Sequence, residues 1–287
     1  MKIVVMGSAG QLGQDIVKVL NEKKVKYYAA TRKDADVTRV NEIDNLFDRE
    51  KPDAVINCAA LHDVNQCEEH PELAMEVNAI SVSNIAKKCS DINAKFMTMS
   101  TDYVFDGIKI EGYTEDDTPN PLMWYGKSKL AGEWFAIANN KKAFVIRTQS
   151  LYGIAGPRGK GLHFVDLMLK FAKEKDEIKV DQCRMAPTWT YPLANNMYAL
   201  LMTEHYGLYH MSCNGVTTWY EFAKKIMELT NNKVKITPVD NDFFPKKFRR
   251  PENTYLINKK LKEINLDVMP DWDDALKEYL KSKGYYV

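Results

Sequence analysis

The stretch MKIVVMGSAGQLGQDIV, residues 1–17, decides the fold of this chain. An apolar run of strand length is followed by three glycines and then by apolar residues at helical spacing. Gly7 permits a tight turn, Gly10 lets the backbone approach a phosphate, and Gly13 permits close packing of the helix on the strand. A strand, a glycine-rich turn and a helix N-terminus in this order predict a site for a dinucleotide pyrophosphate.

Apolar runs of strand length alternate with helical patterns through the first two thirds of the chain. We expect strands at residues 2–7, 25–30, 54–60, 95–100 and 143–148. We expect helices between them at residues 11–20, 40–50, 71–89 and 124–138. Continuously apolar strands joined by crossover helices predict an α/β fold with a doubly wound, Rossmann-like parallel sheet.

The alternation loosens after Tyr152, where the helical patterns are separated by shorter strand patterns. The expected helices lie at residues 163–174, 193–202 and 218–231, and the expected strands at 177–180, 206–212 and 235–239. This change predicts a smaller C-terminal α/β lobe. We place the dinucleotide-binding domain at residues 1–150 and the substrate-binding lobe at residues 151–287, and leave open that their segments interleave.

Composition narrows the class of protein. The chain has 287 residues, 45% of them hydrophobic, and a net charge of +1, which indicates a globular protein and favours neither nucleic acid nor a membrane as partner. The sequence shows no signal-peptide pattern, so we expect a cytoplasmic location. Five cysteines without a CxxC pair and five histidines without an HxxxH pair predict buried thiols and no metal site.

The end of the second expected strand bears on the choice of dinucleotide. A site strict for NAD places an acidic residue there to bind the adenosine ribose, whereas this chain has Arg32 and Lys33. Cations at this place suit a 2′-phosphate and favour NADP, with NAD as the second candidate. The alternative interpretation is that both are solvated loop charges.

The sequence contains four Tyr-xxx-Lys pairs, each of which could supply a catalytic proton donor. Reduction of a carbonyl by a nicotinamide needs a proton donor, and a tyrosine serves when a cation one helical turn away lowers the pKa of its phenol. The pairs are Tyr125/Lys129, Tyr220/Lys224, Tyr255/Lys259 and Tyr279/Lys283. The spacing alone does not choose among them.

The surrounding sequence selects the first pair. The fourth strand ends in Ser100 and Thr101, at the sheet edge where ligands of open parallel sheets bind. A helix begins soon after Pro121, which places Tyr125 and Lys129 in its first turns. We expect another stripe of this helix to face the core, with residues Leu130, Trp134 and Ile137. The other three pairs are interpreted as helix-surface residues.

Seven segments together resemble a known family: GSAGQLG, INCAA, VNA, STDYVFDG, YGKSKLAGE, RTQSLYG and RRPENTYL. The GxxGxxG spacing is that of short-chain dehydrogenases, and the whole set resembles their extended members of the dTDP-4-dehydrorhamnose reductase type. The resemblance runs over nearly the whole chain. It implies NAD(P)H-dependent reduction of the C4 ketone of dTDP-4-dehydro-L-rhamnose to dTDP-L-rhamnose, a step of polysaccharide biosynthesis.

The resemblance also assigns site residues. It implies Thr101, Tyr125 and Lys129 as the catalytic group, with Asp36 and Val37 beside the adenine and Asp102 and Tyr103 facing the sugar. The full set of expected cofactor residues is Gly7, Gly10, Gln11, Leu12, Gly13, Arg32, Lys33, Asp36, Val37, Ala59, Ala60, Tyr125 and Lys129. The expected substrate residues are His62, Val64, Asp102, Tyr103, Ser150, Arg249 and Arg250, the two arginines because guanidinium matches a diphosphate.

Departures from the family pattern gather where the sugar should bind. His62 stands at a usual threonine, Asn65 at a usual aspartate and Ser150 at a usual tryptophan, while Arg184 and Met185 alter the DQxGxPT segment. A related nucleotide-4-ketosugar therefore stays open as the substrate. A non-catalytic NADP-binding subunit, similar to the β subunit of methionine adenosyltransferase, is a further alternative, but the complete catalytic group favours an enzyme. We also expect a homodimer.

Overall fold

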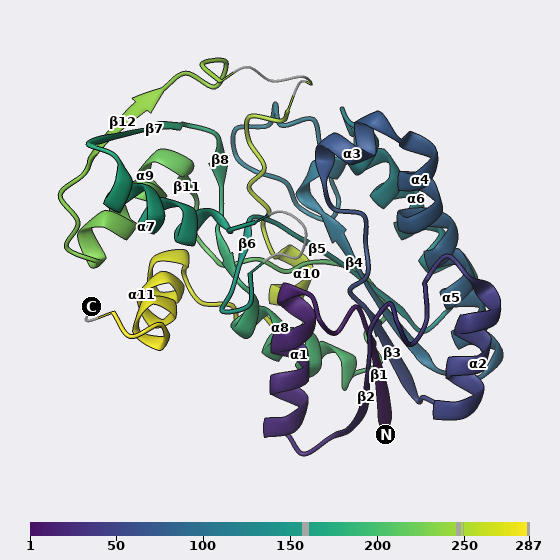
Figure 1. The fold of residues 1–287 in the computed structure, drawn as a ribbon. Helices are drawn as coiled ribbons and strands as arrows, with labels where there is room; N and C mark the ends of the chain where they lie inside the picture. The colour runs from purple at the N-terminus through teal and green to yellow at the C-terminus, as the bar shows by residue number, and fades with distance from the viewer. Residues whose placement is uncertain (157–160, 245–247, 249, 286–287) are drawn as a thin grey trace.

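The computed structural model of the chain describes residues 1–156, 161–244, 248 and 250–285. Its central feature is a six-stranded sheet in the order β10-β5-β4-β3-β1-β2, in which every neighbouring pair is parallel (Figure 1). The strands are β1 (Lys2–Met6), β2 (Lys26–Ala30), β3 (Ala54–Asn57), β4 (Lys95–Thr101), β5 (Ala143–Thr148) and β10 (Gly207–His210). Strand β2 lies on one side of β1, and β3 lies on its other side. The strand order therefore reverses between β1 and β3, and this is the topological switch point.

Helices cover both faces of this sheet. Helices α1 (Gln11–Glu22) and α8 (Thr190–Leu201) pack on each other and contribute to one core cluster, and α2 (Val40–Glu50), α5 (Ser81–Asp91) and α6 (Trp124–Asn139) contribute to the other. The shorter elements are α3 (Val64–Glu69), α4 (Pro71–Met75), the π-helix η1 (Glu76–Ile80), the 3₁₀ helix η2 (Asp102–Val104) and α10 (Lys259–Glu263). The predicted doubly wound α/β fold is therefore confirmed, and the helix expected at 71–89 contains a π-helical turn.

The C-terminal lobe lies beyond the carboxyl ends of these strands (Figure 1). Tyr152, Phe222 and Tyr279 are buried in its core. Its elements are α7 (Phe164–Glu174), α9 (Trp219–Leu229), α11 (Trp272–Ser282) and the strand pairs β6 (Leu151–Tyr152) with β9 (Thr188–Trp189), β7 (Glu177–Asp181) with β12 (Lys235–Val239), and β8 (Arg184–Met185) with β11 (Thr217–Thr218).

Two segments expected in the lobe return to the sheet instead. The residues of β10 pair in parallel with β5, and α8 packs on α1. The reason is that β5 would otherwise be an unpaired sheet edge, and that α8 carries Leu193, Met197 and Leu200 on the face that covers the sheet. The chain thus passes from sheet to lobe and back, and the division at residue 150 stays a prediction.

Helix α6 corrects another expectation. Leu130 is buried, but the side chains of Trp134 and Ile137, expected in the core, leave those residues 63% and 46% exposed. The buried face is made of small and polar residues because the helix lies close to other main chain. A Cβ on Gly126 would strike the Tyr103 carbonyl, and one on Gly132 would strike the Asn78 carbonyl. Close packing, rather than apolar periodicity, therefore sets the orientation of α6.

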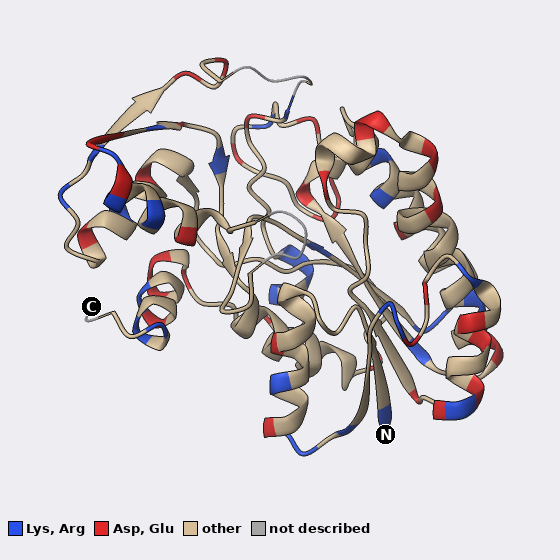
Figure 2. Cartoon of the chain, in the orientation of Figure 1, with Lys and Arg blue, Asp and Glu red and all other residues tan. Residues whose placement is uncertain are grey.

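Charge is mixed over the surface. Figure 2 shows lysines and arginines interspersed with aspartates and glutamates on the outer helices. Among the described residues, no helix is both long and apolar enough to cross a bilayer.

Candidate active site

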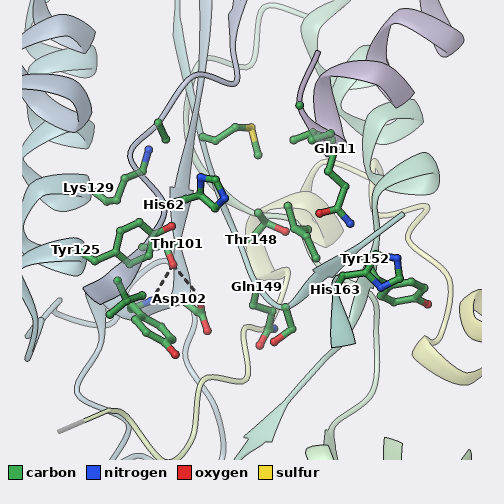
Figure 3. Close-up of a pocket in the computed structure, with 18 of the residues that line it drawn as sticks. Gln11, His62, Thr101, Asp102, Tyr125, Lys129, Thr148, Gln149, Tyr152 and His163 are labelled. Carbon is green, nitrogen blue, oxygen red and sulfur yellow. Dashed lines mark hydrogen bonds between the residues drawn. The ribbon is translucent and has the colours of Figure 1, made fainter. Parts of the chain in front are cut away.

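A cavity of about 950 Å³ opens at the carboxyl ends of β1, β3, β4 and β5 and extends to the C-terminal lobe. Its volume is in the range of ligand sites, and it includes the topological switch point. The glycine turn forms one end, Thr101 and Tyr125 the middle, and residues of the lobe the opposite wall (Figure 3). Two of the cysteines expected to be buried, Cys58 and Cys183, are half-buried and line this cavity.

The glycine turn has the form that a pyrophosphate requires. Gly7 has a φ of +71°, a value that favours glycine, and a Cβ there would crowd the backbone of Ala59. A Cβ on Gly13 would strike the Gly7 carbonyl and the backbone of Ser8. No side chain caps the N-terminus of α1, so its first N–H groups remain available for an anion. Gln11 and Leu12, both expected in the cofactor site, also line the cavity.

The adenosine end is less complete than the sequence predicted. Arg32 lines the cavity, and its Nε lies 2.9 Å from Asp36 Oδ2. Partial burial would raise the pKa of Asp36, but hydrogen bonds from Thr38 and Arg32 outweigh it and lower that pKa. Lys33, Asp36 and Val37 are described but lie outside the cavity lining. Arg32 is therefore the cation best placed for a 2′-phosphate.

The predicted catalytic group is brought together in the middle of the cavity. Thr101 ends β4, while Tyr125 and Lys129 lie one turn apart at the start of α6 (Figure 3). The ring centroids of Tyr103 and Tyr125 are 5.9 Å apart, edge to face. Thr101 and Lys129 are each 4% exposed, so their polar atoms act in a site of low effective dielectric. Ala59 and Ala60 line the same cavity after β3.

Burial changes the acid strength of both α6 residues. Desolvation lowers the pKa of Lys129 to about 8, although the nearby Glu133 acts in the opposite direction. Desolvation raises the pKa of the Tyr125 phenol, and a hydrogen bond with Thr101 offsets this in part. The sequence led us to expect a lowered phenol pKa, so that expectation is wrong for this structure, because burial outweighs any nearby cation. The phenol is protonated at neutral pH, which is the form that donates a proton.

The other three Tyr-xxx-Lys pairs do not line the cavity. Tyr279 is buried in the lobe core, which contradicts its interpretation as a surface residue. Tyr255 precedes α10 and is therefore not on a helix. Lys224 is exposed on α9, where its ammonium pairs with Glu221. Context, rather than spacing, distinguished the pair in the site.

Most of the predicted substrate residues line the cavity. These are His62, Val64, Asp102, Tyr103, Ser150 and Arg250. Arg249, predicted beside Arg250, lies outside the described residues. Ser150 has a φ of +47°, an uncommon conformation for a residue with a side chain.

Sequence reasoning missed much of the opposite wall. The additional lining residues of the lobe and of the end of β5 include Thr148, Gln149, Tyr152, His163, Phe164, Asp181, Trp219, Phe222 and Thr254. Several follow strand ends or begin helices, such as His163 before α7 and Trp219 at the start of α9. Their positions at strand ends and helix starts were the only signal in the sequence that these residues could line a site. No sequence motif connects the separate segments from which they come.

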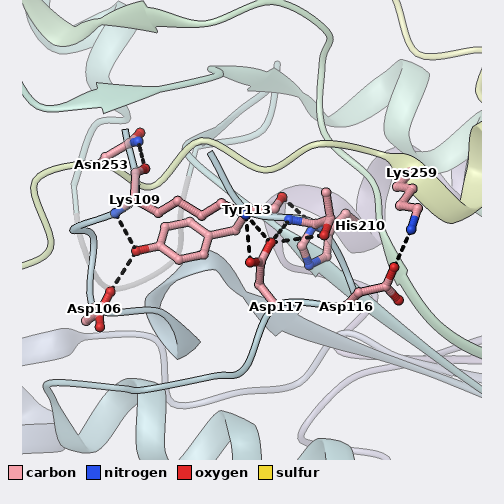
Figure 4. A network of polar contacts seen from close by, with 9 residues as sticks. Asp106, Lys109, Tyr113, Asp116, Asp117, His210, Asn253 and Lys259 are labelled. Carbon is pink, nitrogen blue, oxygen red and sulfur yellow. Dashed lines mark hydrogen bonds and ion pairs between the residues drawn. The ribbon is translucent and has the colours of Figure 1, made fainter. Parts of the chain in front are cut away.

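A polar network holds the segment after Arg250 against the cavity (Figure 4). The Asn253 amide donates to the carbonyl oxygens of Lys109 and Ile110. The Tyr113 N–H donates to the Tyr255 carbonyl at 2.9 Å, and the Tyr113 phenol donates to Asp106 at 2.7 Å. These contacts fix residues 250–254 beside the catalytic edge, although they are far from it in sequence.

Comparison with known proteins agrees with this geometry. The family model of the RmlD substrate binding domain matches residues 1–284. The chain is 34% identical to the spore coat polysaccharide biosynthesis protein SpsK of Bacillus subtilis, an alignment that covers 99% of this chain and 98% of the relative. It is 30% identical to the dTDP-4-keto-6-deoxy-D-glucose reductase of Streptomyces niveus, with 95% and 94% covered.

Solved structures of high similarity share the whole fold. A dTDP-4-dehydrorhamnose reductase of Clostridium acetobutylicum superposes with a TM-score of 0.94 at 39% identity and covers 99% of this chain and 100% of its own. The dTDP-4-dehydrorhamnose reductase of Bacillus anthracis, solved in complex with NADP, superposes with a TM-score of 0.92 at 34% identity, with 98% and 99% covered. The match over residues 1–284 and the shared fold show that this chain belongs to the RmlD substrate binding domain family.

Proposed function

We propose that this protein is an NADPH-dependent reductase of the C4 ketone of a nucleotide-linked 4-keto-6-deoxysugar. The leading substrate is dTDP-4-dehydro-L-rhamnose, which would yield dTDP-L-rhamnose. The observation that carries the proposal is the meeting of Thr101, Tyr125 and Lys129 in one cavity with the glycine turn of residues 7–13. Family members named as reductases, one of them in complex with NADP, support both the reaction and the cofactor.

The residues of the nucleotide end fit the cofactor. Gly7, Gly10 and Gly13 leave room for the pyrophosphate at the uncapped N-terminus of α1, and Arg32 lies where a 2′-phosphate would be read. When bound, NADPH supplies the hydride that reduces the ketone carbon. NAD is a second candidate because Arg32 is already paired with Asp36.

The protein's own part in the reaction is to supply and hold a proton. The Tyr125 phenol donates its proton to the ketone oxygen as negative charge develops there, and the Lys129 ammonium stabilises the resulting phenolate. The Thr101 hydroxyl is the second candidate donor to that oxygen. The phenolate regains its proton from solvent, so one hydride and one proton convert the ketone to an alcohol.

A different 4-ketosugar is a second candidate substrate, favoured by the wall of the cavity. Ser150, a hydroxymethyl group where the family usually has an indole, lines the cavity, and so does His62. The relative from Streptomyces niveus shows by its name that the family includes reductases of another ketosugar. Arg250, which lines the cavity, is our candidate for contact with the nucleotide diphosphate.

The test is NADPH oxidation by the purified protein with a panel of dTDP- and UDP-linked 4-keto-6-deoxysugars, with the product sugar identified by NMR. We expect oxidation with at least one ketosugar and its loss in Tyr125→Phe. If NADPH binds but no ketosugar is reduced, the protein is a cofactor-binding subunit and the proposed function is wrong.

A further inference from the structure

The Asp102 carboxyl is buried directly behind the catalytic group. The residue is 5% exposed, and the Thr101 hydroxyl donates to Asp102 Oδ1 at 2.9 Å (Figure 3). The Tyr103 N–H donates to the same hydroxyl oxygen at 3.2 Å. Tyr125 lines the same cavity, with its ring edge to face against the ring of Tyr103. Asp102, expected from the sequence to face the sugar, lines the cavity and also accepts a hydrogen bond from Thr101.

A hydroxyl has one proton and two lone pairs, and this count limits what Thr101 can do. With Asp102 ionised, the Thr101 proton goes to the carboxylate, and the Thr101 oxygen accepts from the Tyr103 N–H. Thr101 then has no proton left for a ketone oxygen. With Asp102 protonated, the carboxyl donates to Thr101, whose own proton becomes available to the ketone oxygen.

We propose that Asp102 is a positioning residue whose protonated form turns the Thr101 hydroxyl toward the substrate oxygen. This inference deepens the proposed function and rests on it. It changes the expected role of Thr101, which is a donor to the ketone only while the neighbouring carboxyl carries a proton.

The surroundings of Asp102 favour the protonated form. Burial raises the pKa of Asp102 to about 7, although hydrogen bonds from Thr101 and Thr254 act in the opposite direction. The titratable groups that face it are the phenols of Tyr103 on η2 and Tyr125 on α6. The groups beyond Tyr103 are Arg250, Asp181 and Cys183, while His62 and Lys129 line the same cavity.

Thr254 links this carboxyl to the C-terminal lobe. Its N–H and its hydroxyl both donate to the Arg184 carbonyl, at 2.8 and 3.3 Å, which fixes it to β8, and it lies close enough to Asp102 to lower the pKa of that carboxyl. The network of Figure 4 holds the same segment through Asn253. Asp102 therefore lies between the catalytic edge and a segment that is fixed to the lobe.

The first test is the pH dependence of kcat for the ketosugar that the panel identifies. In the wild type, kcat should fall about tenfold per pH unit above a midpoint near 7. The amide of Asp102→Asn donates to Thr101 at every pH, so the kcat of this variant should stay within several-fold of the wild-type value at low pH. Its kcat should not fall at the midpoint near 7. The remaining decline should lie near pH 8, where Lys129 loses its proton. Asp91→Asn, at the exposed end of α5 and outside the cavity, is the control for the same change of side chain and should keep the wild-type profile. A loss of kcat in Asp102→Asn at every pH would overturn the proposal.

The second test does not use activity. Carboxyl ¹³C shifts of aspartate-labelled protein with NADP⁺ bound should show one titration with a midpoint near 7 that is absent in Asp102→Asn. Thr101→Val should move the midpoint upward, because it removes a hydrogen bond to the ionised form. A midpoint below 5 would overturn the inference. If no ketosugar is reduced, the proposed function is wrong. The titration is independent of that result, because it still shows whether the Asp102 carboxyl carries a proton near neutral pH.

Discussion

The two ends of the cavity are built from different material. The nucleotide end consists of main chain: the glycines of residues 7–13, the uncapped turn of α1 and the strand ends of one rigid sheet. The sugar end consists of side chains from separate segments, including Ser150, His163, Trp219 and Arg250. A site made of main chain cannot change its ligand by single substitutions, whereas a wall made of side chains can. The comparison teaches that cofactor and chemistry are fixed here and that sugar choice is adjustable.

The largest expected effect concerns the catalytic group between the two ends of the cavity. Tyr125→Phe removes the proton donor and should lower kcat by roughly 10²–10⁴-fold, the range for a lost general acid. Affinity for NADPH, measured by fluorescence titration, should stay nearly unchanged because the glycine turn is untouched.

Tyr220→Phe is the matched control for this variant. Tyr220 belongs to another Tyr-xxx-Lys pair but lies on α9 outside the cavity, so kcat should hardly change. Equal losses of kcat in the two variants would show that the catalytic tyrosine has been assigned wrongly.

The next effect tests the adjustable end. Ser150→Trp restores the indole that the family usually has and should change kcat/KM by roughly 10–200-fold, the range for a change of pocket size. We expect it to rise for dTDP-4-dehydro-L-rhamnose, or to fall for a bulkier 4-ketosugar if that is the wild-type substrate. The φ of +47° at Ser150 is already uncommon, so a melting curve should accompany the kinetics.

Ile154→Trp is the control for added bulk. Ile154 is 49% exposed and does not line the cavity, so an indole there should leave kcat/KM as it is. If the wild type already reduces dTDP-4-dehydro-L-rhamnose at the efficiency usual in the family and Ser150→Trp changes nothing, position 150 does not set sugar choice.

The same contrast explains what the sequence could predict. The glycine turn, the five strands up to Thr148 and the pair Tyr125/Lys129 depend on residues close together in the chain, and periodicity and spacing report those relations directly. Even for these segments, the sequence did not show which side chains are buried. Burial reversed the expected shift of the Tyr125 pKa, and the close packing of α6 on other main chain left Trp134 exposed.

The sugar wall was mostly out of reach of such reasoning. Trp219 and Thr254 enter the cavity because the lobe folds back over the sheet, and β10 returns to that sheet after more than fifty residues. Such contacts between distant segments have no local signature. Among the predicted substrate residues that line the wall, Asp102 came from the family resemblance and Arg250 from the match of guanidinium to a diphosphate. The resemblance did not predict that Asp102 would hydrogen-bond Thr101.

The smallest effect concerns a charged side chain of the nucleotide end. Arg32 lines the cavity and its side chain is 87% exposed, while Lys33 is exposed and outside the lining. Because solvent screens such a charge, Arg32→Ala should raise the KM for NADPH only about two- to fivefold and leave that for NADH unchanged, and Lys33→Ala should change neither. Asp36→Asn should act in the opposite direction, since it releases the Arg32 guanidinium from its ion pair for a 2′-phosphate. Steady-state kinetics with both dinucleotides measure all three variants. If the wild type prefers NADH, Arg32 pairs with Asp36 and does not bind a 2′-phosphate. The choice of dinucleotide would then depend on side chains, as the choice of sugar does, and not on the glycine turn.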